Sequence, residues 1–208
     1  MGIVKYVTDY FQEKKKERIQ ELNTKYTNIA DECGLANRNL LDIKNRNEYI
    51  NYSNRESWRR SFASLYAQVN KSRRYQKAGI NPETVSVIKA FLDHYQRFDA
   101  ICTEYNKQYV EYEKIQFKDL FDHTENRSLD TQQRDCIVKD EINNLVIAGA
   151  GSGKTTTIVG KVKYLMTRHL YTPEQLLVLA YTNTSATEMA ERIKKETDKD
   201  IDVMTFQG

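Results

Sequence analysis

The sequence predicts an α/β protein in which a helical N-terminal hairpin or bundle precedes the start of a parallel-sheet domain. Two observations lead to this prediction. Residues 145–158 read as an apolar run, a glycine-rich loop and a helix, which is the order of a strand, a phosphate-binding turn and a helix N-terminus. Before residue 126 the only glycines and prolines are Gly2, Gly34, Gly79 and Pro82, so long helices are expected there.

Residues 1–115 carry apolar stripes at alternating spacings of three and four, the periodicity of a helix that packs along a seam. Asn81, Pro82 and Glu83 supply an N-cap, a first-turn proline and an early acid, so a helix is expected to start there. The stripes are Ile19, Leu22, Tyr26, Ile29 and Cys33; Trp58, Phe62, Leu65 and Val69; and Ile88, Phe91, Tyr95, Phe98, Cys102, Tyr105, Tyr109 and Tyr112. Each stripe needs a partner helix to cover it, which favours an antiparallel hairpin or a small coiled-coil-like bundle.

Two features of this region admit a second interpretation. The tyrosine-rich stripe is either core or a platform on which nucleic-acid bases stack, and core is the commoner use of such a stripe. The basic clusters Lys14-Lys-Lys, Arg59-Arg60 and Arg73-Arg74 either contact phosphate or belong to a solvated helix face. Because Glu13, Glu17 and Glu56 are interspersed among them, the solvated face is favoured.

Residues 116–208 are expected to form the nucleotide-binding domain. Residues 117–121 form a connector and residues 122–128 a polar linker. A helix then starts with Asp130 as N-cap and Gln133 three residues later, a near capping box. After the glycine-rich loop we expect a helix over 155–170, a strand over 176–180 covered on both faces, a helix opened by a capping box at Ser185, and a strand over 201–204.

The glycine-rich loop is a candidate phosphate site. Gly153, Lys154 and Thr155 fit the pattern G-x-x-x-x-G-K-[ST], with Ala148 in place of the first glycine. Amides of residues 151–155 and the positive end of the following helix favour an oxyanion, Lys154 can reach the β- and γ-phosphates, and the Thr155 hydroxyl can ligate Mg²⁺. Gln133 either reads the adenine edge, by donating and accepting a hydrogen bond at once, or only caps its helix.

Composition excludes several classes of protein. The net charge is +3 with 29% charged residues, too mild a bias to establish nucleic-acid binding. Cys33, Cys102 and Cys136 are isolated and lack C-x-x-C spacing, so neither a zinc site nor a disulfide framework is indicated. No apolar run reaches transmembrane length, and residues 1–9 lack a signal-peptide core or a myristoylation signal. A reduced cytoplasm without membrane association is expected.

Four motifs of residues 117–208 together resemble the start of a superfamily 1 DNA helicase motor of the UvrD/Rep type, similar to helicase IV. Residues 129–134, Leu-Asp-Thr-Gln-Gln-Arg, resemble the family's adenine-reading motif, and residues 148–155, Ala-Gly-Ala-Gly-Ser-Gly-Lys-Thr, its phosphate loop, in which a leading alanine is common. Residues 179–193 resemble motif Ia, and residues 205–208, Thr-Phe-Gln-Gly, resemble motif Ib. Gln207 stands where the family usually has histidine, which puts the contact made there in doubt.

The resemblance implies a P-loop, RecA-like ATP-binding domain over 116–208 that follows a helical region over 1–115. It implies ATP and Mg²⁺ as cofactors, 3'–5' translocation on single-stranded or partly duplex DNA, and Lys154 as the catalytic residue. The residues implied to hold nucleotide are Gln133, Ala148, Gly149, Ala150, Gly151, Ser152, Gly153, Lys154, Thr155 and Thr156, with Thr155 ligating the metal. Those implied to contact DNA are Thr182, Asn183, Thr205 and Phe206.

The family's later motifs, with its Mg²⁺-binding acids and arginine fingers, do not occur in these 208 residues. We therefore expect an N-terminal fragment of a helicase that turns ATP over negligibly by itself. Two alternatives remain open. One is a helicase-like ATPase that binds and recycles RNA polymerase through its helical hairpin, and the other is a naturally short nucleotide-binding regulator.

Overall fold

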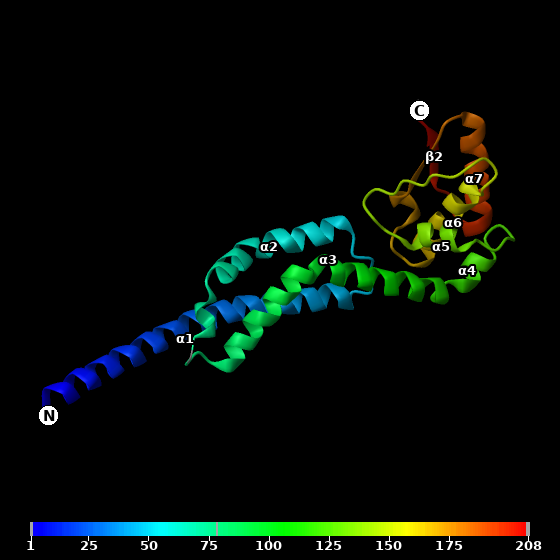
Figure 1. Ribbon diagram of the computed structural model, residues 1–208. Coiled ribbons are helices and arrows are strands. Elements are labelled where there is room, and N and C mark those ends of the chain that lie inside the picture. The colour runs from blue at the N-terminus through cyan, green and yellow to red at the C-terminus, as the bar shows by residue number, and fades with distance from the viewer. Residues whose placement is uncertain (1, 78, 207–208) are drawn as a thin grey trace. The chain divides into compact units, whose positions relative to one another are not determined.

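The computed structural model describes residues 2–77 and 79–206 (Figure 1). It is mostly helical, with one two-stranded parallel sheet, and this composition is compatible with the predicted α/β class. Its contacts divide the chain into two compact units, Met1–Tyr105 and Asn106–Gly208, here called the helical unit and the nucleotide unit. Helix α3 (Pro82–Gln116) begins in the helical unit and ends in the nucleotide unit.

The helical unit consists of α1 (Gly2–Asn45), α2 (Tyr52–Lys71), the short 3₁₀ helix η1 (Arg73–Gln76) and the first part of α3. Most members of the three predicted stripes meet in one core. Its fully buried members include Cys33, Ile88, Phe91, Phe98 and Cys102. The small bundle predicted from the stripes is therefore confirmed, and so is the start of α3 at Pro82, where Asn81 Oδ1 accepts a hydrogen bond from Glu83 N.

Aromatic side chains dominate this core. Trp58 lies parallel to Phe98 with ring centroids 4.1 Å apart, and Tyr66 lies parallel to Tyr95 at the same distance. Trp58 is 2% exposed and Phe98 is fully buried. These rings stack on one another inside the bundle, so the stripe is core and offers no open platform for bases. Its last member, Tyr112, is an exception at 48% exposure.

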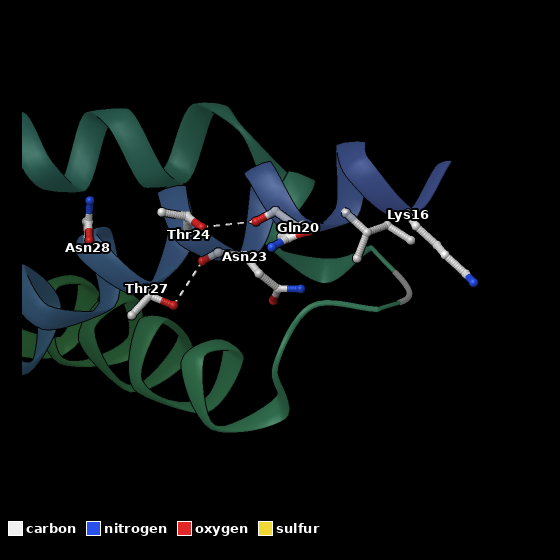
Figure 2. A pocket seen from close by; sticks show the side chains of 7 residues that line it. Lys16, Gln20, Asn23, Thr24, Thr27 and Asn28 are labelled. Carbon is white, nitrogen blue, oxygen red and sulfur yellow. Dashed lines mark hydrogen bonds between the residues drawn. The ribbon is translucent and has the colours of Figure 1, made fainter. Parts of the chain in front are cut away.

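The side chain of Asn23 on α1 hydrogen-bonds two backbone groups of the connection from α2 to α3. Asn23 Nδ2 donates to the Gly79 carbonyl at 2.8 Å, and Asn23 Oδ1 accepts from Asn81 N at 2.9 Å. Figure 2 shows Asn23 among the polar side chains of α1 that line a hollow beside this connection. An amide serves here because it donates and accepts at once, satisfying two backbone groups of the connection.

The basic clusters of the helical unit are partly neutralised by their neighbours. Arg59 donates to Asp99, Arg60 to Glu56, and Lys14 to Glu17. These pairs favour the solvated face over a phosphate-binding surface. N-terminal to the bundle core, α1 continues as a helix whose large apolar side chains are exposed: Ile3, Val4, Tyr6, Val7, Tyr10 and Phe11.

The nucleotide unit begins with the last turns of α3 and with α4 (Lys118–Asp122) and α5 (Thr131–Val138). Helix α6 (Lys154–Thr167), the 3₁₀ helix η2 (Pro173–Gln175), strand β1 (Leu177–Ala180), α7 (Asn183–Thr197) and strand β2 (Asp202–Thr205) follow. β1 and β2 pair in parallel, from Leu177 opposite Asp202 to Ala180 opposite Thr205. The α3 end is fixed to α6 because the buried Glu113 accepts from Tyr164 at 2.7 Å and from Arg168 at 3.0 Å.

Several predicted elements of this unit were wrong. Residues 145–148 form no strand, and Leu145 and Ile147 are 87% and 90% exposed. A strand requires a neighbour that pairs with its backbone, and β1 and β2 pair only with each other. β1 was predicted to be covered on both faces, yet Leu177 is 56% and Leu179 44% exposed.

Two helix boundaries also differ from the prediction. α6 ends at Thr167 instead of residue 170, and His169 follows with a left-handed backbone, φ 57°. α7 begins at Asn183, and its N-cap is Thr182, whose hydroxyl accepts from Ser185 N at 3.1 Å. The serine chosen as cap from the sequence is thus inside the first turn. Among the described residues, no helix is long and apolar enough to cross a membrane.

Candidate functional site

The glycine-rich loop ends at Gly153, which is the N-cap of α6 and has a left-handed backbone, φ 81°. This backbone angle favours glycine, and a Cβ at this position would lie 2.7 Å from Gln133 Nε2, so the glutamine side chain would have to move. No side chain caps α6. Its first-turn amides therefore remain available to an anion, and the helix dipole adds positive potential at the same place.

Lys154 is the first residue of α6 and is exposed. Its Nζ donates to the carbonyls of Ala148 at 3.1 Å and Gly149 at 2.7 Å. The Gly149 carbonyl also accepts from Ser152 Oγ at 2.9 Å. The ammonium group is thus held at the mouth of the loop by neutral acceptors, which a phosphate can replace because charge-assisted hydrogen bonds are stronger.

Gln133 joins α5 to the loop. Its backbone N donates to Asp130 Oδ1 at 2.9 Å and its Oε1 accepts from Asp130 N at 2.9 Å, which completes the capping box predicted as partial. In addition, its Nε2 donates to the Ser152 carbonyl at 3.1 Å. Capping and loop contact therefore coexist, and one amide hydrogen and one oxygen lone pair remain for a base.

A cavity of about 580 Å³ lies between α5 and the loop. It is lined on one side by Gln133 and Cys136 and on the other by Ala148, Gly149 and Lys154. Its volume is in the range of pockets that hold a cofactor. Burial raises the pKa of the Cys136 thiol, so the thiol form lines the cavity.

Helix α5 is held in place by residues of α6. Gly160 lies where a Cβ would come within 2.9 Å of Ile137 Cδ1, so the two helices approach closely there. Lys161 Nζ donates to the carbonyls of Ile137 at 2.7 Å and Lys139 at 3.1 Å, at the C-terminal end of α5. Burial lowers the pKa of Lys161. Because Gln133 belongs to α5, these contacts set its position relative to the loop.

The remaining loop residues differ in exposure. The Thr155 side chain is half-buried, Thr156 is 8% exposed, and Gly149, Ala150, Gly151 and Ser152 are exposed. Thr155 follows Lys154 in the first turn of α6, and its hydroxyl is the Mg²⁺ ligand that the sequence predicts. Within residues 2–77 and 79–206, no group of three or more His, Cys, Asp or Glu side chains is arranged to hold a metal. A metal here would therefore depend on Thr155 and on phosphate oxygens.

The residues predicted to contact DNA gather at one edge of the sheet. β1 and β2 are parallel and Ala180 pairs with Thr205, so Thr182 and Asn183 after β1 lie at the same edge as Phe206 after β2. Phe206 is 76% exposed and Thr205 is 9% exposed. The Thr182 hydroxyl is engaged in capping α7. Gln207 and Gly208, the last residues of the predicted motif Ib, lie outside the described residues.

Sequence reasoning missed three basic residues that organise the unit. Arg134 donates to Asp122 at 2.6 Å, to Ser128 Oγ at 2.9 Å and to the Leu129 carbonyl at 2.7 Å, which fixes the linker before α5. Lys161 holds the end of α5, and Arg192 contacts Thr156 and Glu125. The only local signal was the spacing of Glu188 and Arg192, four residues apart on one helix.

Comparison with known proteins shows what the segment containing this site is similar to. A family model that describes the UvrD/REP helicase N-terminal domain matches residues 129–208, which contain Gln133, the loop and α7. The chain is 38% identical over 106 residues to DNA helicase IV of Escherichia coli (strain K12), covering 50% of this chain and 16% of that protein. It is 39% identical over 67 residues to ATP-dependent DNA helicase UvrD1 of Mycobacterium leprae (strain TN), covering 32% and 9%.

DNA helicase II of Escherichia coli (strain K12) gives a similar match, 39% identical over 66 residues, covering 32% of this chain and 9% of that protein. The matched segment is thus similar to the N-terminal domain of UvrD/REP helicases, which supports the resemblance predicted from the motifs. The chain spans 16% or less of the length of these three relatives.

Proposed function

We propose that this chain is the N-terminal portion of an ATP-dependent DNA helicase that couples ATP hydrolysis to 3'–5' translocation on single-stranded or partly duplex DNA. The observation that carries the proposal is the uncapped N-terminus of α6, with Lys154 beside it and the loop tied to Gln133. The similarity to proteins named DNA helicases supports it. In this proposal the nucleotide unit is the start of a P-loop, RecA-like domain that further strands complete.

Each residue of the loop has a role in this proposal. The amides of residues 151–155 bind phosphate oxygens, and Lys154 leaves the Ala148 and Gly149 carbonyls to contact the β- and γ-phosphates. The Thr155 hydroxyl holds Mg²⁺, which when bound neutralises phosphate charge. Gln133 uses its remaining donor and acceptor to select adenine.

The sheet edge that carries Thr182, Asn183 and Phe206 contacts the DNA strand. Backbone amides and short polar side chains there suit phosphate and sugar, and the exposed ring of Phe206 suits stacking with a base. Because motif Ib ends in Gln207 where the family usually has histidine, we assign no contact to that residue.

The test is the ATPase of the full-length protein. Replacing Lys154 with alanine should lower DNA-stimulated turnover by roughly 10²–10³-fold, since it removes charge stabilisation from an exposed position without opening a cavity. Lys195→Ala, an exposed lysine on α7, is the matched control. Unchanged turnover in the Lys154 variant would refute the phosphate-site assignment. The 208-residue chain alone should bind ATP but turn it over far below roughly 1–100 s⁻¹.

A second experiment addresses Gln133. Gln133→Ala in the full-length protein should relax the preference for ATP over GTP, because the remaining amide hydrogen and lone pair match adenine and not guanine. The variant also loses the tether to Ser152, so the affinity for both nucleotides should fall. Equal falls for ATP and GTP would leave Gln133 as a cap and tether only.

One observation favours a second function, in which the helical unit binds a protein. The exposed side chains Ile3, Val7, Tyr10 and Phe11 lie on the part of α1 N-terminal to the core, and they suit a protein surface better than water. In the alternative proposal the protein is a helicase-like ATPase that recycles RNA polymerase. Binding of purified RNA polymerase, abolished by Val7→Asp with Phe11→Asp, would support it, and no binding would reject it.

A further inference from the structure

Arg192 connects three segments of the nucleotide unit. Its Nε and Nη2 donate to the two carboxylate oxygens of Glu125 at 2.6 and 2.7 Å. Nη2 also donates to Thr156 Oγ1 at 3.2 Å, and Nη1 donates to Glu188 at 3.2 Å. The guanidinium of α7 thus touches the linker between α4 and α5 and the first turn of α6, which is the turn that follows the phosphate loop.

This contact is partly shielded from water. The side chains of Arg192 and Glu125 are 27% and 18% exposed, and Thr156 is 8% exposed. The bidentate pairing fixes the guanidinium plane, which a lysine would not do. Glu125 itself is held, because its backbone N donates to Glu196 at 3.0 Å. The Arg192 guanidinium lowers the pKa of Glu125, so the carboxylate stays charged.

The contact between Arg192 and Thr156 joins the proposed nucleotide site to the helix that carries a proposed DNA contact. Thr156 immediately follows the Mg²⁺-ligating Thr155. Arg192 lies on the helix whose first residue is Asn183, a proposed DNA contact, and the rise of an α-helix separates the two by only about 14 Å. A movement of the first turn of α6 is therefore passed to the start of α7 along one rigid helix.

We propose that Arg192 is a positioning residue that couples the nucleotide site to the DNA-contacting edge. Through Thr156 it fixes the phosphate-binding turn relative to α7, so that nucleotide and DNA each change the affinity for the other. The inference rests on the proposed helicase function and adds to it the route of the coupling. Arg192 touches neither ligand in this assignment.

The test is the coupling between the two ligands in the full-length protein. The measured quantity is the ratio of single-strand dissociation constants with and without a non-hydrolysable ATP analogue, and linkage requires the same ratio for the analogue with and without DNA. Typical couplings are roughly 5–150-fold. Arg192→Gln should bring this ratio close to one, and Glu125→Gln should move it toward one as well. In the double variant the two losses should not add, because both remove one contact.

A matched control separates coupling from stability. Lys163 also joins α6 to α7, through Glu196 Oε2 at 2.8 Å, but it lies away from the phosphate-binding turn, and its substitution leaves Glu196 Oε1 in place to accept from Glu125 N. Lys163→Gln should keep the wild-type ratio. An equal loss in Lys163→Gln would overturn the inference, since any bridge between the two helices would then suffice.

The test also covers a variant that does not fold and a wild-type protein that shows no coupling. If Arg192→Gln does not fold, Arg192→Lys replaces it. Its ratio should also move toward one, because lysine keeps the charge but cannot form the bidentate pair with Glu125. A wild-type ratio in a folded Arg192 variant overturns the inference alone. If the wild-type protein itself shows no coupling, or binds neither ligand, the proposed function fails and the inference fails with it.

Discussion

Apart from the N-terminal part of α1, the helical unit buries most of its large apolar side chains among its own helices, whereas the nucleotide unit leaves many of them exposed. Ile88, Phe91 and Phe98 are fully buried in the first unit, while Leu145 and Ile147 in the second are 87% and 90% exposed. Helices satisfy their backbone internally and need only one partner face. A strand in a parallel sheet needs neighbours along its edges and layers over both faces. A few helices close in sequence can provide each other with a partner face. Neighbouring strands and covering layers come from segments that are far apart in the sequence.

The first prediction tests the closed core. Phe98→Ala should lower the unfolding free energy of the helical unit by about 3–5 kcal/mol, because it removes a fully buried ring stacked on Trp58. Trp58 is the only tryptophan among the 208 residues, so its fluorescence during denaturation reports this unit alone. Leu41→Ala, at a 55% exposed position of α1, is the control and should change the stability of this unit by roughly 0.5 kcal/mol or less. Similar effects of both variants would contradict a core that is closed around Trp58.

The second prediction tests the open sheet. In the 208-residue chain the amides of residues 145–148 should exchange with solvent at nearly unprotected rates, because they form no strand. The amides of α6 around Val159, a fully buried residue, should be protected. In the full-length protein residues 145–148 should become protected if further strands complete the sheet. Hydrogen exchange read by mass spectrometry compares the two proteins, and equally fast exchange in both would show that this segment is never a strand.

The same difference explains what the sequence predicted. Helix starts are local: Asn81 with Pro82, and Asp130 with Gln133, are adjacent or three residues apart. The phosphate loop was predicted for the same reason, since its residues are contiguous. The strand over 145–148 was predicted from its apolar residues, but whether it forms depends on partners that an apolar run does not specify.

The long-range contacts of the site were not predictable. Arg192 and Glu125 are 67 residues apart, and Gln133 and Ser152 are 19 apart. Each partner has an equally reasonable local role, as an i,i+4 pair with Glu188 or as a helix cap. Only the fold selects which charged residues meet. Contiguous residues thus predict where the glycine-rich loop lies, but not which distant residues hold it in place.

The third prediction concerns the ion pair between Glu125 and Arg192 in the nucleotide unit. The folded pKa of Glu125 lies below its ordinary value of 4.5 because of Arg192, so this pair stabilises the fold above about pH 4.5 and its contribution is lost as the pH falls through the folded pKa. Glu125→Gln should destabilise the unit at pH 7 and differ less from wild type at pH 3. Native-state hydrogen exchange of α6 amides measures the difference in stability between the variant and wild type at each pH. A difference that grows at low pH would have the wrong sign.

The smallest effect is expected when basic residues of the helical unit are replaced and DNA binding is measured. Arg73 and Arg74 are exposed and adjacent, so they are the basic pair of this unit best placed to contact phosphate. If they contact single-stranded DNA, replacing both with glutamine in the full-length protein should reduce the slope of log K against log salt by about 0.7 per contact. We expect the slope to stay unchanged, because the helical unit packs its aromatic stripe inward and pairs Arg59 and Arg60 with acids. Binding measured at several salt concentrations decides between the two, and a slope lower by more than one would assign a DNA-binding role to the helical unit.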